Sequence, residues 1–476
     1  MIPFKNWKRR TKLIATLGPA TESGETIFSL IESGVDIFRF NMSHGKPDWV
    51  REKAALIQEF SRRLGKYVGM LLDTQGPAIR TGDLPDQMQL KPGDIFTFTV
   101  RGEKVEDQHS VSVNYDDIVN DIQLGDVVLV DNGNIKMKVI SKEKNFLRCE
   151  VLTPGVMKSR RHINIPGVRI NLPPLTQKDL RDIQLGIECG MDFFALSFVR
   201  EANDCDLLRQ ILISKGSSGK VVAKIEDQLA IKNLFQIIDS SDAIMIARGD
   251  LGIECPFEEL PIIQRRIVKS CIQKRKPVIV ATHLLESMIM NPVPTRAEIT
   301  DIANAVYEQA DCLMLSGETA SGRYPVECIK ILDRVAVRTE KSGGAGYASL
   351  VELLGDEEKL AKTAVHLADD VGAPAICVFT RFGFLASLIA GLRPRYSVIY
   401  AFCPDEEVCR KLTLNYGVEP CYVVFPKSQE ESIELVEKFL KTKGIESGQK
   451  IVLISEVPLK GERDRFILLH QLHYIE

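Results

Sequence analysis

Short apolar runs alternate with longer amphipathic segments along most of this chain, and this alternation constrains the fold more than any other feature. The intervening segments, such as 24–34, 256–276 and 325–341, carry apolar residues at helical spacing. Near-continuous apolar strands that alternate with helices are typical of a parallel sheet buried on both faces. A (β/α)8 TIM barrel requires eight such runs, and they occupy residues 12–18, 36–45, 68–76, 192–198, 221–227, 243–250, 277–283 and 312–319.

One long gap separates the third run from the fourth. Its middle, roughly residues 88–170, contains short β-rich pieces that are divided by the turn sequences KPGD, LGD and DNGN. This pattern predicts a small β-barrel domain inserted after the third strand. The helical pattern of residues 176–190 then resumes the alternation.

The end of the chain repeats the α/β pattern as a separate block. KSGGAG (341–346) reads as a linker, and the strand-like stretches AICVFT, SVIYAF, CYVVF and KIVLIS follow it with helical patterns between them. We expect an open, mostly parallel sheet, whose strand order the sequence does not reveal. The expected domains are a barrel formed by 1–75 and 172–341, an inserted β domain at 76–171, and a C-terminal α/β domain at 342–476.

Charge and cysteine content indicate which partners and which cellular compartment to expect. Lys and Arg number 61 against 64 Asp and Glu, and a net charge of -3 does not indicate nucleic acid or an anionic membrane as a partner. No apolar stretch of about 18 residues indicates a membrane span, and the N-terminus lacks the apolar run of a signal peptide. The 11 cysteines form no CxxC pair, as expected of buried thiols in a reducing compartment. We therefore predict a cytoplasmic location.

Every apolar run ends in residues that can bind or transfer charge. Active sites of this barrel class lie at the carboxyl ends of the strands. Charged groups embedded there are uncommon, because burying them unpaired is costly. The polar residues at these ends are Thr16; Arg39, Asn41, Ser43 and His44; Asp73 and Thr74; Ser197; Lys224 and Glu226; Arg248 and Asp250; Thr282 and His283; and Ser316 and Glu318.

Lys224 and Glu226 are two residues apart on one strand, so both side chains point to the same face. Glu226 and Asp250 end neighbouring strands, and two carboxylates at one barrel mouth can share Mg²⁺ with waters and substrate oxygens. Arg39, Lys224 and Arg248 would bring positive charge to that mouth. Phosphoryl transfer needs such a set, because its transition state spreads negative charge over oxygens. The alternative is an internal ion-pair network that only fixes the strand ends.

Eight sequence blocks resemble the signature blocks of pyruvate kinase, in that family's order, over about residues 11–330. The inserted β domain and the C-terminal α/β domain also fit the family's three-part plan. The resemblance implies transfer of the phosphoryl group of phosphoenolpyruvate to ADP, giving pyruvate and ATP, the last step of glycolysis. The blocks are TKLIATLGPAT, FRFNMSHG, LLDTQGPAIRTG, AKIED, IARGDLGIE, ATHLLESM, NPVPTRAEITDIANAV and LSGETASGRYPVE.

The resemblance assigns roles on the substrate side. Lys224 would stabilise the transferring phosphoryl group and the developing enolate, while Arg39 and Arg80 would contact phosphoryl oxygens. Thr282 would help deliver the proton that converts enolpyruvate to pyruvate. The backbone of Gly249 and Asp250 would bind the substrate carboxylate. The full substrate-binding set is Arg39, Lys224, Thr282, Gly249 and Asp250.

The resemblance also assigns metal ions and nucleotide. Glu226 and Asp250 would ligate Mg²⁺, and oxygen ligands without a Cys or His cluster suit Mg²⁺ and K⁺. The inserted domain would close as a lid and exclude water that could hydrolyse the phosphoryl donor. The positions matching a K⁺ site are Asn41, Ser43, Asp73 and Thr74. The nucleotide side would be lined by Asn41, His44, Lys66, Arg80 and Arg161.

Several positions depart from the family pattern. Ala78 stands where a glutamate accompanies potassium dependence and a lysine accompanies independence, so the resemblance leaves the need for K⁺ open. His283 replaces a common glutamine, and it either tunes proton delivery or acts as a neutral hydrogen-bonding spacer. Many family members bind a sugar-phosphate effector on a loop rich in Ser, Thr and Gly, through hydroxyls and free backbone N–H groups. The matching stretch here is TRFGFLA (380–386), in which Phe382 and Phe384 replace hydroxyl or small residues. We therefore predict weak or absent activation by fructose bisphosphate.

The sequence leaves two alternative functions. The first is a Mg²⁺-dependent aldolase or lyase that acts on phosphoenolpyruvate or an oxoacid without ADP, and the inserted domain with Arg39, Arg80 and Lys224 argues against it. The second is a catalytically silent sensor on the same fold, and the retained catalytic and metal positions argue against that. The resemblance further suggests a homotetramer built through barrel and C-terminal contacts.

Overall fold

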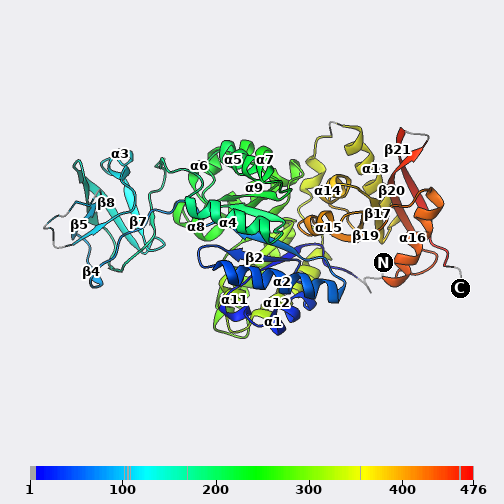
Figure 1. Cartoon of the computed structure of the whole chain (residues 1–476), viewed down its shortest axis with the longest axis horizontal. Helices are drawn as coiled ribbons and strands as arrows, with labels where there is room; N and C mark the ends of the chain where they lie inside the picture. Colours follow the sequence, from blue (N-terminus) through cyan, green and yellow to red (C-terminus); the bar gives the residue numbers. More distant parts are fainter. Residues whose placement is uncertain are drawn as a thin grey trace.

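Three domains follow one another along the long axis of the molecule (Figure 1). The inserted β domain, called the lid from here on, lies at one end. The barrel is in the middle, and the C-terminal α/β domain is at the other end. This computed structural model describes residues 7–474 except 101, 104, 106, 108, 169, 354, 460 and 461. Within these residues, no helix is both long enough and apolar enough to cross a bilayer.

Eight parallel strands close into a barrel in the order β1-β16-β15-β14-β13-β12-β3-β2, which confirms the predicted (β/α)8 architecture. The strands are almost entirely buried, because side chains fill the barrel on one face and helices cover the other. Their bounds are β1 (Lys12–Thr16), β2 (Ile37–Asn41), β3 (Gly69–Asp73), β12 (Phe193–Leu196), β13 (Lys220–Ile225), β14 (Ala243–Ala247), β15 (Val278–Ala281) and β16 (Cys312–Leu315).

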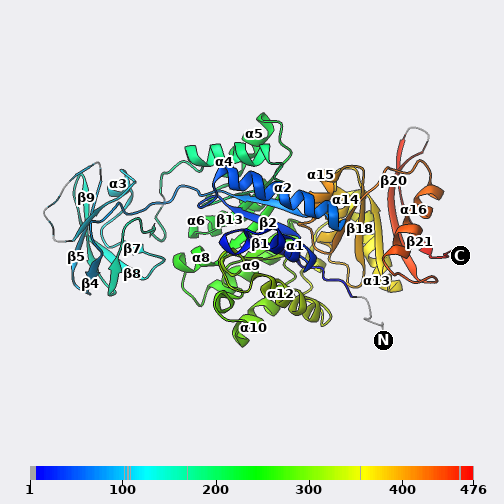
Figure 2. The ribbon, with the colours of Figure 1, turned by 60° about the horizontal axis from the view of Figure 1, so that its bottom comes forward.

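Helices surround the barrel (Figure 2). Some of them begin or end at residues with recognisable capping chemistry. Thr176 caps α4 by accepting from the N–H of Asp179, and α2 ends at Gly65, whose φ of 59° suits glycine. The helices are α1 (Gly24–Glu32), α2 (Pro47–Leu64), α4 (Gln177–Glu188), α5 (Ala202–Ser214), α6 (Gln228–Lys232), α7 (Leu234–Ser240), α8 (Arg248–Glu254), α9 (Leu260–Gln273), α10 (Arg296–Tyr307), α11 (Gly317–Ala320) and α12 (Pro325–Glu340), with 3₁₀ turns η2 (Pro19–Thr21), η3 (Glu286–Ile289) and η4 (Tyr347–Leu350).

The lid is a β domain inserted between β3 and α4. Its main sheet has the order β11-β7-β8-β9-β5-β6, and β10 pairs with β4 in a second, small sheet. Arg80 pairs with His162 and Thr81 pairs with Val113, so one short segment joins both edges of the main sheet. The elements are β4 (Met88–Leu90), β5 (Ile95–Thr99), β6 (Ser110–Ser112), α3 (Ile118–Asp121), β7 (Val127–Val130), β8 (Ile135–Lys142), β9 (Phe146–Val151), β10 (Gly155–Met157) and β11 (Ile163–Asn164).

The C-terminal domain is the predicted open, mostly parallel sheet. Its order is β19-β18-β17-β20-β21, and only β21 runs antiparallel to its neighbour. The sequence pattern did not predict β21, whose residues alternate weakly. The elements are α13 (Asp356–Val371), β17 (Ala375–Phe379), α14 (Phe384–Gly391), β18 (Val398–Cys403), α15 (Glu406–Leu412), β19 (Val418–Tyr422), α16 (Gln429–Thr442), β20 (Lys450–Leu459) and β21 (Glu462–Gln471).

The C-terminal domain closes the amino end of the barrel. Leu414 packs among the apolar side chains that fill the barrel, including Leu71 and Phe193. A buried ion pair between Arg393 and Asp311, 2.6 Å apart, ties the same surfaces together. The carboxyl end of the barrel, which faces the lid, is therefore the end that can admit ligands.

Candidate active site

A hollow of about 360 Å³ lies at the carboxyl end of the barrel, between the strand ends and the lid. It gathers residues that are far apart in the sequence, because barrel closure brings all the strand ends to one rim. Among the residues expected from the sequence, it is lined by Arg39, Asn41, Ser43, Asp73, Thr74, Arg80, Arg161, Lys224, Glu226 and Asp250.

The Lys224 ammonium is held by three oxygen groups at the end of β13. Its Nζ lies 2.8 Å from Glu226 Oε1 and 3.2 Å from Asp73 Oδ1, and it donates to Ser197 Oγ at 2.7 Å. Burial by itself would lower the pKa of Lys224, but the carboxylates of Asp73 and Glu226 outweigh it and raise that pKa. Lys224 therefore stays a cation although it is almost fully buried.

Glu226 combines burial with a second carboxylate nearby. Its Oε2 accepts from the backbone N–H of Phe198 at 2.6 Å. Burial raises the pKa of Glu226 to about 7, and the charge of Asp250 adds to this effect, although Lys224 opposes it. Glu226 and Asp250 line the same hollow and offer carboxylate oxygens, which are the ligands that Mg²⁺ prefers.

The number of protein ligands also suits that ion. Mg²⁺ usually keeps several waters and takes one or two carboxylates together with substrate oxygens. The pair Glu226 and Asp250 meets this requirement.

Asp73 organises the other side of the hollow. It accepts from Arg39 Nε at 2.7 Å, and Arg39 also donates to Thr16 Oγ1 at 3.1 Å. Burial by itself would raise the pKa of Asp73. The positive charges of Lys224 and Arg39 outweigh burial and lower this pKa below its ordinary value, so the carboxylate stays ionised. The four residues expected at a K⁺ site, Asn41, Ser43, Asp73 and Thr74, all line the hollow.

Thr282 lies just after β15 in a backbone conformation that β-branched residues rarely adopt, with a φ of 70°. Its Oγ1 accepts from the N–H of Gly249 at 2.7 Å and donates to the carbonyl of Ala281 at 2.6 Å. Arg248 donates to the Thr282 carbonyl at 2.6 Å. These contacts hold the hydroxyl in place. The neighbouring His283 is exposed and also has a positive φ of 56°.

Arg248 does not deliver its charge to the hollow, contrary to the prediction. Its guanidinium pairs with Asp301 at 2.8 Å and binds the backbone at the end of β15. Glu318 likewise serves the backbone, because it accepts from the N–H groups of Leu285 and Ser316. Arg248 and Glu318 therefore stabilise strand ends beside the hollow, which is the role that the alternative interpretation gave to such charged residues.

The lid contributes Arg80 and Arg161 to the hollow, and Arg161 pairs with Asp131 at 3.1 Å. His44 is exposed on the loop after β2 and does not line it. Lys66 lies at the opposite end of the barrel, just before β3, where its Nζ donates to the carbonyls of Ile31 and Glu32 at 3.0 and 3.3 Å. The expectation that Lys66 lines the nucleotide side is therefore not supported by its position.

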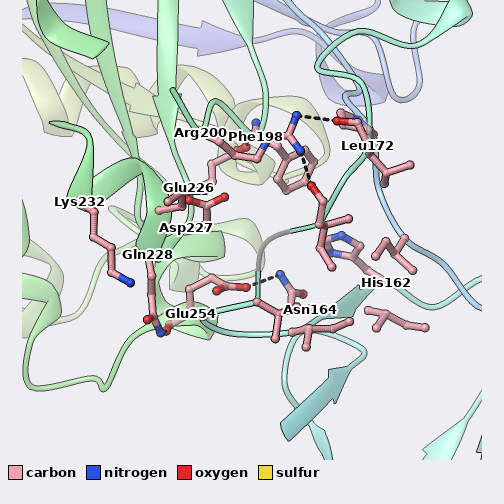
Figure 3. Close-up of a pocket in the computed structure, with 18 residues that line it drawn as sticks. His162, Asn164, Leu172, Phe198, Arg200, Glu226, Asp227, Gln228, Lys232 and Glu254 are labelled. Atoms are coloured by element: carbon pink, nitrogen blue, oxygen red, sulfur yellow. Dashed lines mark hydrogen bonds between the residues drawn. The ribbon is translucent and has the colours of Figure 1, made fainter. Parts of the chain in front are cut away.

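Sequence reasoning missed His162 and Phe198, which line both this hollow and a second one at the root of the lid (Figure 3). In the second hollow, Asn164 of the lid donates to Glu254 of the barrel at 3.2 Å. The sequence signal for His162 was its place beside Arg161 in KSRRHINIPG. Phe198 carried no such signal, because it reads as one more apolar residue in a strand.

Comparison with known proteins agrees with this geometry. The family model for the pyruvate kinase barrel domain matches residues 8–329, and the model for the pyruvate kinase alpha/beta domain matches residues 358–465. The chain belongs to the pyruvate kinase family. Family membership makes it a phosphotransferase, and the two models agree with the predicted barrel and C-terminal α/β domain.

Individual pyruvate kinases resemble the chain over most of its length. It is 42% identical over 458 residues to the chloroplastic isozyme G of Nicotiana tabacum, covering 95% of this chain and 81% of that protein. It is 37% identical over 463 residues to a pyruvate kinase of Staphylococcus aureus, covering 94% and 78%. The crystal structure of a Cryptosporidium parvum pyruvate kinase superposes with a TM-score of 0.92 at 34% identity, covering 97% and 96% of the two chains.

Proposed function

We propose that this member of the family transfers the phosphoryl group of phosphoenolpyruvate to ADP in the hollow between barrel and lid, giving pyruvate and ATP. One observation carries the assignment of the site. The Lys224 ammonium is fixed beside Glu226 and Asp73, in the same hollow as Arg39, Arg80 and Asp250. A buried cation, two arginines and a carboxylate pair for Mg²⁺ meet the electrostatic needs of phosphoryl transfer.

Each side chain has a defined task in this proposal. Lys224 holds its positive charge toward the transferring phosphoryl group and the enolate oxygen, while Arg39 and Arg80 orient the phosphoryl oxygens. Thr282 holds a proton at Oγ1 for delivery to the enolate carbon. Glu226 and Asp250 would hold Mg²⁺, which supplies charge neutralisation at the phosphoryl oxygens when bound.

The lid and a second cation complete the proposal. Of the residues assigned to the nucleotide side, Asn41, Arg80 and Arg161 line the hollow. Lid closure excludes water. Asn41, Ser43, Asp73 and Thr74 are proposed to hold K⁺. The cytoplasmic location and the homotetramer stay predictions.

A coupled assay tests the reaction. Pyruvate released from phosphoenolpyruvate only when ADP is present, with one ATP formed per pyruvate, supports the proposal. Pyruvate released at the same rate without ADP would instead favour the lyase alternative.

A further inference from the structure

Phe198 links the lid to the carboxylate that is proposed to hold Mg²⁺. It is the second residue after the end of β12 and has a φ of 56°, a conformation that bulky residues keep only where their surroundings hold it. Its backbone N–H donates to Glu226 Oε2 at 2.6 Å. The position of this amide therefore decides where one oxygen of Glu226 lies.

The ring of Phe198 contacts both chain crossings between barrel and lid. On the outgoing crossing, a Cβ atom built on Gly76 would lie 2.8 Å from Phe198 Cδ2, so the ring packs against the bare glycine backbone. On the return crossing, the His162 ring lies 5.8 Å from the Phe198 ring, centroid to centroid, at an interplanar angle of 53°. This separation is that of an aromatic pair.

His162 belongs to the lid. It pairs with Arg80 across the lid sheet and immediately precedes β11. In Figure 3, His162 and Asn164 lie on the lid side of the second hollow, while Glu226 and Glu254 lie on the barrel side. A displacement of the lid therefore displaces the ring that packs against Phe198.

We propose that His162 is a positioning residue for Glu226 and acts through Phe198. With the lid in the position seen here, the His162 ring supports the Phe198 ring, and the Phe198 amide fixes Glu226 toward the Mg²⁺ position. Lid closure and metal affinity are thereby coupled. This inference rests on the proposed role of Glu226 as a Mg²⁺ ligand.

The test measures binding of Mn²⁺ alone to the full-length protein without substrate, from the electron paramagnetic resonance signal of free Mn²⁺. We expect His162→Gly to weaken binding by about three- to tenfold, the change in equilibrium constant that loss of one aromatic pair produces. His162→Phe should restore binding, because it keeps a ring at the contact. His109→Gly, which removes the other histidine of the lid, should have no effect.

A double-mutant cycle separates a relay from a general loss of structure. In a Phe198→Ala background, His162→Gly should weaken Mn²⁺ binding no further, because the ring that it supports is gone. Additive effects of the two substitutions would overturn the inference. Mn²⁺ binding by His162→Gly at the wild-type affinity would also overturn it.

Glu226→Gln distinguishes failure of the relay through Phe198 from failure of the proposed metal site. If Glu226→Gln abolishes Mn²⁺ binding while His162→Gly leaves it unchanged, the relay is wrong and the metal site stands. If Glu226→Gln binds Mn²⁺ like the wild type, the proposed metal site itself is wrong. Thermal unfolding midpoints of the variants show whether each one is folded.

Discussion

The Lys224 ammonium lies 2.8 Å from Glu226 Oε1, and both groups project from the carboxyl end of β13. The strand pattern predicts that these side chains share a face, and the family resemblance implies that they serve different ligands. In this structure they are ion-pair partners, and Asp73 is a second carboxylate beside Lys224. Ligands that use either group must therefore rearrange an existing buried contact.

Replacing Lys224 by Met should abolish most turnover. The substitution removes the only cation that contacts both Asp73 and Glu226 among the described residues, and loss of such charge stabilisation typically lowers kcat by about 10²–10³-fold. The measurement is pyruvate release at saturating substrate. Circular dichroism must show a folded protein, because breaking a buried ion pair can cost about 3–5 kcal/mol. Unchanged turnover would contradict the central role of Lys224.

Thr282→Ala should lower kcat more than Thr282→Ser. Serine keeps an Oγ that can accept from the Gly249 N–H and hold a proton, whereas alanine removes both functions. We expect a loss of about 10²-fold or more for alanine, as for other proton-transfer groups, and less than about tenfold for serine. Steady-state kinetics of the two variants provide the comparison. Equal kcat values would show that the hydroxyl is not needed.

Glu254→Gln should change how stability depends on pH. Burial raises the pKa of Glu254 to about 7, above its ordinary value of 4.5. The folded state therefore binds the proton more tightly than the unfolded state, and this stabilising contribution is lost as the pH rises from about 4.5 to 7. Glutamine is neutral and can still accept from Asn164.

We therefore expect Glu254→Gln to stabilise the protein at pH 8, by up to about 3 kcal/mol, and to change it little at pH 5. Chemical unfolding at both pH values measures the difference. Glu258→Gln, at an exposed position nearby, is the matched control. An equal effect of Glu254→Gln at pH 5 and pH 8 would rule out titration as the cause.

Potassium should increase the activity of the wild type, because all four oxygen-bearing residues of the expected K⁺ site line the hollow together with Ala78. Ala78→Lys should reduce this dependence, since an ammonium there would supply the missing positive charge. Rates in KCl and in tetramethylammonium chloride of equal ionic strength measure the effect. Ala78→Met controls for side-chain size. Equal stimulation of the lysine and methionine variants would contradict the prediction.

Fructose bisphosphate should leave the phosphoenolpyruvate saturation curve nearly unchanged. Phe382 and Phe384 are 82% and 57% exposed, and the hydroxyl of Thr380 already accepts from the N–H of Gly383 at 3.1 Å. This loop therefore presents rings where a phosphate would need hydroxyl and N–H donors. Initial rates with and without the effector test this expectation. A large leftward shift of the curve would refute it.

The sequence by itself determined the barrel architecture and the strand ends that surround the hollow. Apolar runs with strand length and helices with caps are local features, and eight of them in alternation specify a closed parallel barrel. Since all strands of such a barrel point the same way, the residues after each run must share one rim. That is why Arg39, Asp73, Lys224 and Glu226 could be grouped before any contact was known.

Only the tertiary structure decided which of these side chains enter the hollow and which support it. Arg248 follows a strand as Asp250 does, yet it turns to the backbone of Thr282 and to Asp301. The pair formed by His162 and Phe198 joins the lid to the barrel, at positions that no local pattern relates. Packing between distant segments decides the rotamers, the backbone strain and the contacts across domains. Sequence periodicity is a local property and does not predict that packing.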